Sequence, residues 1–228
     1  CNWNDNDVRV MFGNGLGSFD AAQSLSVGLT PRSLVAVDLT GDGVADLAVV
    51  NYSSSTVSVF LNSGSGNFGT ARHWAVGQNP IVVVACDMNS DGAIDLVVAD
   101  RINFIQPPSP PQFQGALTVL INGGGGLFPI RKDTLFGPDI EDIDAGDVSG
   151  DGVPDVVVVS SGISVHSGTG DGTFQRPLGL NSGIVSGQRP KHVMLGDVTG
   201  DKITDVIVGT NKMTMVLLPG TGAGIQDT

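Results

Sequence analysis

The chain alternates between short apolar runs and polar, glycine-rich segments. Valine and other β-branched residues fill runs such as IVVVAC and DVVVV, which is typical of β-strands. Apolar residues do not recur at the three- and four-residue spacing of an amphipathic helix. The pattern therefore predicts an all-β fold.

A nine-residue acidic pattern recurs four times and divides the chain into repeats. It reads DLTGDGVAD at Asp38–Asp46, DMNSDGAID at Asp87–Asp95, DVSGDGVPD at Asp147–Asp155 and DVTGDKITD at Asp197–Asp205, with starts 49, 60 and 50 residues apart. A second pattern joins an alternating strand to a glycine-rich turn and an aromatic residue. It reads VRVMFGNGLGSF from Val8, VSVFLNSGSGNF from Val57 and LTVLINGGGGLF from Leu117, each beginning 30 residues before an acidic loop, and it weakens in the later repeats. Such self-similarity is the signature of a repeat architecture.

Each repeat predicts four strands. One strand enters the acidic loop (SLVAVD, IVVVACD, IDAGD, HVMLGD) and one leaves it (DLAVVN, DLVVAD, DVVVVS, DVIVGT). The alternating strand is the third, and a strand after the aromatic residue is the fourth. Four short strands in about 50 residues match a blade of a β-propeller, whereas a parallel β-solenoid repeats at much shorter periods.

We therefore expect one domain over residues 1–228, a β-propeller of four-stranded antiparallel blades. The blade count stays open at about four to five. The C-terminal strands and the N-terminal strand after Phe19 could share a closing blade, or the chain could be a fragment of a larger propeller.

The acidic loops carry the candidate chemistry. Oxygen donors at positions 1, 3, 5 and 9, with a backbone carbonyl at position 7, are the ligands that calcium prefers, and glycine at position 6 permits the tight turn. The predicted ligands are Asp38, Thr40, Asp42, the Val44 carbonyl and Asp46; Asp87, Asn89, Asp91, the Ala93 carbonyl and Asp95; Asp147, Ser149, Asp151, the Val153 carbonyl and Asp155; and Asp197, Thr199, Asp201, the Ile203 carbonyl and Asp205. An EF-hand is excluded, because position 12 is valine in all four loops where an EF-hand needs glutamate.

The alternative interpretation is that these loops are only Asp-Gly turns. Three carboxylates in each of four loops would then repel one another without a counter-ion, which favours metal. The fourth loop is the weakest site, because Lys202 replaces the position-6 glycine and adds a positive charge. We therefore expect three to four Ca²⁺ ions.

Together, the D-x-[TNS]-x-D-G-x-x-D loops, the DLVV-type strands and the FLNSGSGNF-type turns resemble the FG-GAP or VCBS repeats of integrin-like β-propellers. The resemblance runs from Val8 to about Ile225. It implies calcium in the loop between the first two strands of each blade, and an extracellular or secreted location. The chain departs from the pattern at Lys202, in the short side chains at position 3 and in an insertion in the second full repeat.

Charge and motif content narrow the function. A net charge of -12 with only 11 Lys and Arg argues against nucleic-acid partners, and no apolar run is long enough to predict membrane insertion. The glycine turns are followed by no helix that could bind phosphate. The three histidines, His73, His166 and His192, are scattered, so we expect no catalytic site. Cys86 lies in an apolar run typical of a buried free thiol, although a pair with Cys1 stays open.

If strands alternate in direction, the acidic loops and glycine turns share one face of the propeller. The opposite face is then the candidate surface for a protein or glycan partner. It would carry Asn51–Thr56, the insertion Arg101–Gly115 with Phe104 and Phe113, Ser161, Gly162 and Asn211, joined by Arg32, Gln78, Asn79 and Arg189 from the links between blades.

The sequence thus predicts a calcium-stabilised, non-enzymatic binding or adhesion module. A carbohydrate-binding lectin is one alternative, although Trp3, Tyr52 and Trp74 do not recur from repeat to repeat. An accessory propeller domain of a secreted polysaccharide lyase or dehydratase is another. The oligomeric state stays open.

Overall fold

The computed structural model describes residues 1–104, 112–136, 140–180, 187–212 and 214–220. Over these ranges the chain forms strands and turns without a helix, so the all-β prediction is confirmed. Within the same ranges there is accordingly no helix that could span a membrane.

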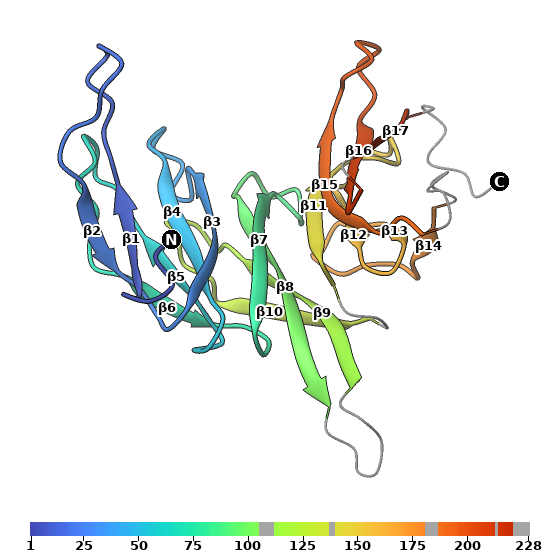
Figure 1. Ribbon diagram of the computed structural model, residues 1–228, viewed down its shortest axis with the longest axis horizontal. Helices are drawn as coiled ribbons and strands as arrows, with labels where there is room; N and C mark the ends of the chain where they lie inside the picture. The colour runs from blue at the N-terminus through green and yellow to red at the C-terminus, as the bar shows by residue number, and fades with distance from the viewer. Residues whose placement is uncertain (105–111, 137–139, 181–186, 213, 221–228) are drawn as a thin grey trace.

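The described strands form five antiparallel sheets, and within each sheet the strands follow chain order (Figure 1). The N-terminal sheet holds β1 (Asp7–Val10) and β2 (Gln23–Ser26); blade 1 holds β3 (Pro31–Val37), β4 (Asp46–Asn51), β5 (Thr56–Phe60) and β6 (Arg72–Ala75); blade 2 holds β7 (Pro80–Cys86), β8 (Asp95–Phe104), β9 (Gln112–Ile121) and β10 (Ile130–Leu135); blade 3 holds β11 (Asp142–Gly146), β12 (Asp155–Val159), β13 (Ile163–His166) and β14 (Leu178–Gly179); the C-terminal sheet holds β15 (Pro190–Gly196), β16 (Asp205–Thr210) and β17 (Met215–Leu218). Three sheets are thus the predicted four-stranded blades.

The sheets stand one after another along an open arc (Figure 1). The first strands of neighbouring sheets contact one another in the order β3, β7, β11, β15. In the described part of the chain β17 pairs only with β16, and β2 pairs only with β1. Among the described strands, β2 and β17 thus do not share a closing blade. β2 lies instead against blade 1, where its Leu25 is buried against Leu47 and Phe60.

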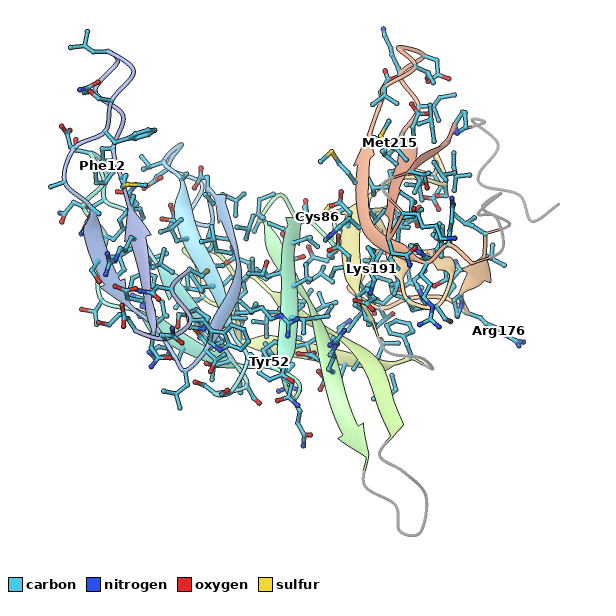
Figure 2. All side chains as sticks on the ribbon, viewed as in Figure 1. Phe12, Tyr52, Cys86, Arg176, Lys191 and Met215 are labelled. Atoms are coloured by element: carbon cyan, nitrogen blue, oxygen red, sulfur yellow. The ribbon has the colours of Figure 1, made fainter. Side chains whose placement is uncertain are left out.

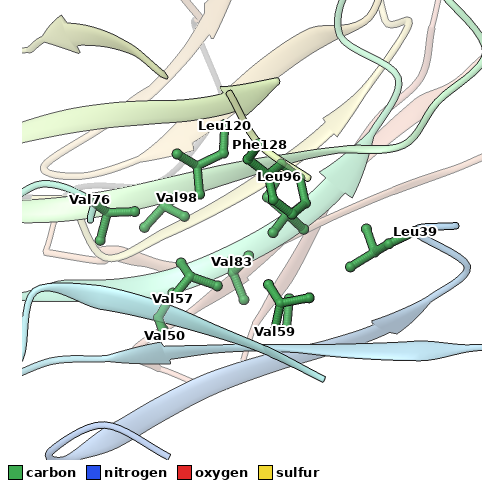
Figure 3. Packing of buried hydrophobic residues seen from close by; sticks show 11 residues of the cluster. Leu39, Val50, Val57, Val59, Val76, Val83, Leu96, Val98, Leu120 and Phe128 are labelled. Atoms are coloured by element: carbon green, nitrogen blue, oxygen red, sulfur yellow. The ribbon is translucent and has the colours of Figure 1, made fainter. Parts of the chain in front are cut away.

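Valine-rich strands form the core because both faces of each blade are covered. In β12 every residue of DVVVV is buried. Figure 3 shows the seam between blades 1 and 2, where Val50 and Val59 of blade 1 face Leu96, Val98 and Phe128 of blade 2. Burying one such side chain contributes about 1.5–3 kcal/mol, so each seam is a large part of the stability.

The insertion in the second repeat lengthens the β8–β9 hairpin, which projects beyond the blades in Figure 1. Its backbone pairs as far as Phe104 with Gln112. The proline run at 107–111 and the side chains of Phe104 and Phe113 lie outside the described residues, so the predicted partner contact at this loop stays a prediction. Both cysteines are free: Cys1 is exposed and Cys86 is half-buried.

Candidate metal-binding loops

The four acidic loops adopt one backbone conformation, with left-handed residues at positions 4 and 6. Position 6 has φ of 83° at Gly43, 89° at Gly92, 84° at Gly152 and 69° at Lys202. Position 4 is also left-handed, and it is glycine in three loops and Ser90, with φ of 58°, in the second. Sequence reasoning identified position 6 and missed position 4, although glycine at 41, 150 and 200 was the available signal.

The position-1 aspartate is held by backbone amides of its own loop. In the first loop Asp38 Oδ1 accepts hydrogen bonds from the amides of Thr40, Gly41 and Asp42, and Oδ2 accepts one from Gly43 at 2.7 Å. Alternating right- and left-handed residues turn successive N–H groups inward into an anion-binding concavity. These hydrogen bonds, led by that of Gly43, lower the pKa of Asp38.

The side chain at position 5 closes the second half of each loop. Its Oδ1 accepts the backbone N–H of position 7, at 2.8 Å for Asp42 with Val44 and at 2.9 Å for Asp91 with Ala93. Asp151 and Asp201 make the same bond to the amides of positions 153 and 203. This bond lowers the pKa of Asp91. The position-5 carboxylates are all exposed, so a cation can reach them from solvent.

The position-9 aspartate is fully buried and joins two distant segments. Asp46 Oδ2 accepts the amide of Leu39 at 2.9 Å, and its Oδ1 accepts the amide of Asn62, just beyond β5, at 2.7 Å. Asp95, Asp155 and Asp205 repeat this arrangement with Asn122, Gly168 and Gly220. Sequence reasoning read position 9 only as a metal ligand. Its bond to the start of the glycine turn was missed, because that partner lies 13 to 27 residues away.

The buried carboxylates differ in acidity according to their surroundings. Burial raises the pKa of Asp95 to about 6, and it raises the pKa of Asp155 as well. In the fourth loop the amide of Gly220 outweighs burial and lowers the pKa of Asp205.

The donor set fits calcium in kind, since every predicted side-chain ligand is a carboxylate, amide or hydroxyl oxygen. The position-3 side chains also point into the loop: Asn89 Nδ2 donates to Asp91 Oδ2 at 2.8 Å, and Thr40 Oγ1 donates to Asp38 Oδ1 at 3.3 Å. Over the described residues, however, no three Asp, Glu, His or Cys side chains gather around one point. The loops thus carry the predicted ligand residues in the predicted order, and the carboxylates at positions 1, 5 and 9 accept hydrogen bonds from backbone amides.

The expected division into two faces agrees with the hydrogen bonds. On one face, called the acidic face, every acidic loop contacts the glycine turn of its own sheet through position 9. Asn122 Nδ2 of blade 2 also reaches the first loop and donates to the Leu39 carbonyl at 2.8 Å.

On the opposite face, called the link face, the loop after the second strand of a sheet contacts the link that precedes that sheet. The amide of Tyr52 donates to the Thr30 carbonyl at 2.9 Å, and the amide of Asn211 donates to the Arg189 carbonyl at 2.9 Å. Figure 2 shows Cys86, next to the second acidic loop, above Tyr52, which lies toward the opposite end of the strands.

The link face carries cationic and hydroxyl groups. The Arg32 guanidinium lies 5.3 Å from the centroid of the Tyr52 ring. A cavity of about 290 Å³ opens beside the predicted residues Ser161 and Gly162. It is lined by Phe136, Val158, Ser160, Ser161, Gly162, Ile163, Ser164, His166, Pro177 and Gly179.

The three histidines lie on different sheets, each beside one polar partner. His73 Nδ1 is 3.0 Å from Ser58 Oγ, His166 Nε2 is 2.9 Å from Ser164 Oγ, and His192 Nδ1 is 3.3 Å from Asp142 Oδ2. The second ring nitrogen of the buried His166 has no partner, so no carboxylate orients this serine-histidine pair. Burial lowers the pKa of His166 to about 4. The pair therefore lacks the third member of a hydrolytic triad.

Comparison with known proteins identifies a family whose model matches this chain. A family model described as an FG-GAP-like repeat matches residues 1–49, 38–98 and 147–208. No curated protein matches the chain. Among solved structures, one described as BBS1N in complex with ARL6DN, soaked with lead, matches with a TM-score of 0.37 and 10% identity over 98% of this chain and 91% of that chain. That TM-score is too low to establish a shared fold.

Proposed function

The chain belongs to the FG-GAP-like repeat family, and we propose that it is a calcium-stabilised, extracellular, non-enzymatic module that binds a protein partner on its link face. The observation that carries the proposal is the structural difference between the two faces. The acidic face repeats one conformation four times, whereas the link face differs from blade to blade. A repeated surface suits a common structural ion, and a varied surface suits recognition of one partner.

Calcium would be held by the ligands at positions 1, 3, 5, 7 and 9 of each loop. Twelve of the 23 acidic residues lie in these loops. Ca²⁺ takes six to eight oxygen ligands and would neutralise the carboxylates that now rely on backbone amides. Free calcium at extracellular concentrations suits such exposed loops, which supports the extracellular assignment.

The partner surface would centre on Tyr52 and Arg32 and extend to the cavity at Ser161. A tyrosine stacked under an arginine offers apolar area, a hydrogen-bonding hydroxyl and a fixed cation, the combination enriched where proteins bind one another. The cavity adds the serines Ser160, Ser161 and Ser164 to the same face, beside apolar side chains such as Phe136 and Ile163.

Site-specific cross-linking tests the proposal. A photo-reactive amino acid at Tyr52 should capture a defined protein from the extracellular fluid of the source organism, and the same group at Asp42 on the acidic face is the matched control. The capture should disappear with Arg32→Ala. Equal capture from both positions, glycan binding that Arg32→Ala abolishes, or turnover of a polysaccharide would each overturn the proposal.

A further inference from the structure

A buried polar cluster in blade 2 is not explained by calcium or by partner binding. Asp100, the residue five positions after the loop aspartate Asp95, is fully buried. Its Oδ2 is 2.7 Å from Thr118 Oγ1, and the same hydroxyl oxygen is 2.8 Å from Asp133 Oδ1. Thr118 is also fully buried, so Asp100 and Thr118 meet away from solvent, whereas the Asp133 side chain is 47% exposed.

The number of protons in this cluster is fixed by its geometry. A threonine hydroxyl has one hydrogen to donate, and ionised carboxylates only accept. Thr118 therefore cannot satisfy Asp100 and Asp133 at once if both are ionised. Arg131 Nε lies 2.9 and 3.0 Å from the two oxygens of Asp133, which identifies Asp133 as the ionised member.

With a proton on Asp100, each hydrogen bond of the Thr118 hydroxyl has one donor and one acceptor. Asp100 donates to Thr118 Oγ1, and the amide of Gly77 donates to the same oxygen at 3.2 Å. The threonine hydrogen is then free to bind Asp133. The hydroxyl thus accepts twice and donates once, its full capacity.

Blade 1 has the same arrangement with an amide in place of the acid. Asn51, five positions after Asp46, is fully buried and donates from Nδ2 to Ser58 Oγ at 2.8 Å. The link amide of Gly28 donates to the same oxygen at 3.3 Å, and His73 Nδ1 lies 3.0 Å from it. The fold therefore places a hydrogen-bond donor where blade 2 has Asp100.

We propose that Asp100 is held as a neutral carboxylic acid in the native protein, and that loss of its proton is a switch that loosens the seam between blades 1 and 2. Burial, the largest cause, raises the pKa of Asp100 to about 7, and the Asp133 carboxylate adds to the rise, while Thr118, Arg131 and the amide of Gly77 oppose it. The second oxygen, Oδ1, is buried without a partner, so an ionised Asp100 would have no compensating donor there.

The seam depends on this cluster because the chain passes from blade 1 to blade 2 beside it. The link residue Gly77 bonds to Thr118, and Arg131 Nη1 donates to the carbonyl of Val76 at 3.1 Å. A Cβ at Gly77 would lie 2.5 Å from the Asp100 carboxyl group, so the link and the acid are in close contact. An anion at Asp100 would compete with Asp133 for the one threonine hydrogen and weaken the anchor of the link.

The expected pH dependence has a definite sign. In the unfolded chain Asp100 ionises near its ordinary value of 3.8, whereas the folded protein keeps its proton up to about pH 7. Between these values the folded state binds more protons, so the folding equilibrium constant falls by up to about tenfold per pH unit as pH rises, and is flat above the window. Asp95, Asp142, Asp144 and Asp155 also have raised pKa values, so only a comparison of variants isolates Asp100.

Urea unfolding between pH 4 and 9, in a constant excess of chelator, tests the proposal. Between pH 4 and 7 the folding constant of the native protein should fall by about three-hundredfold relative to that of Asp100→Asn, which has no acid to ionise at this position. The matched variant Asn51→Asp places an acid where blade 1 has an amide. Its stability should therefore fall further below that of the native protein as pH rises. A ratio for Asp100→Asn that does not change with pH would overturn the proposal.

Infrared spectroscopy gives a second readout that needs no stable variant. The native protein should show a protonated carboxyl C=O band that disappears with a midpoint near pH 7, above that of Asp95 at about 6. Asp100→Asn, if folded, should lack this band. A native protein with no carboxyl band titrating near pH 7 would contradict the neutral acid directly.

Discussion

The position-9 aspartate should contribute to stability even when no metal is present, and Asp155→Ala tests this. Asp155 accepts three backbone hydrogen bonds, from Val148 at 3.1 Å, Ser149 at 2.9 Å and Gly168 at 3.0 Å. Leaving a buried donor unpaired costs about 1–3 kcal/mol. Leaving all three donors unpaired would therefore cost roughly 3–9 kcal/mol of stability. The lower end is expected if water enters the loop and pairs with them.

The matched control is Asp151→Ala in the same loop. Asp151 is exposed and its Oδ1 accepts the amide of Val153 at 2.8 Å, a bond worth about 0.5–1.5 kcal/mol. In chelator, Asp155→Ala should therefore cost several times as much as Asp151→Ala. In calcium the cost of Asp151→Ala should rise, because a metal ligand is lost as well.

The assay is urea unfolding followed by circular dichroism, in chelator and in excess calcium. The free energy of unfolding of a native domain is only about 5–15 kcal/mol, so Asp155→Ala can leave too little folded protein to measure. Asp155→Asn, which keeps one acceptor oxygen, then serves as the milder variant and should fall between the other two. Equal costs for the alanine variants in chelator would refute the hydrogen-bond role of position 9.

Three further predictions concern single positions. Chelation should lower the melting temperature, and in calcium Asp42→Ala should cost more stability than Asp201→Ala, because Lys202 already weakens the fourth site; a melting temperature insensitive to chelator, or the reverse order, would contradict this. In chelator, Lys202→Gly should stabilise the protein by about 1 kcal/mol, since Lys202 has φ of 69° and a left-handed residue with a Cβ is strained; a loss in urea unfolding would count against it. His166 has a pKa lowered to about 4 against 6.5 when unfolded, so stability should be lost as pH falls through that window, and His166→Gln should lack this part of the slope in a pH series of urea midpoints; an unchanged slope would refute it.

Much of the fold could be predicted because the signals are local and repeated. The entering and leaving strands appear as β3 and β4, and again in the three later repeats, where the apolar runs placed them. The third strands follow the alternating pattern. The continuous valine run of β12 fits a strand that is buried along its whole length.

The candidate site was predicted in composition but not in its contacts. Asp42 and Asp46 both stand at fixed positions of the repeated pattern. Asp42 is exposed and accepts a hydrogen bond within its own loop, whereas Asp46 is buried and accepts one from the amide of Asn62. Nothing in the nine-residue pattern distinguishes them. The difference arises because β5 returns beside the loop, a pairing between segments far apart in the chain.

The sequence by itself determined the repeat, the order of strands within each blade and the oxygen-rich loops, since each depends on residues within one short segment. The tertiary structure alone decided which aspartates are buried, that the described strands β2 and β17 do not pair with each other, and that Asp100 meets Thr118, Asp133 and the Gly77 link. The physical reason is that burial and proton sharing depend on groups from separate strands. Those groups come together only when the sheets form and stack.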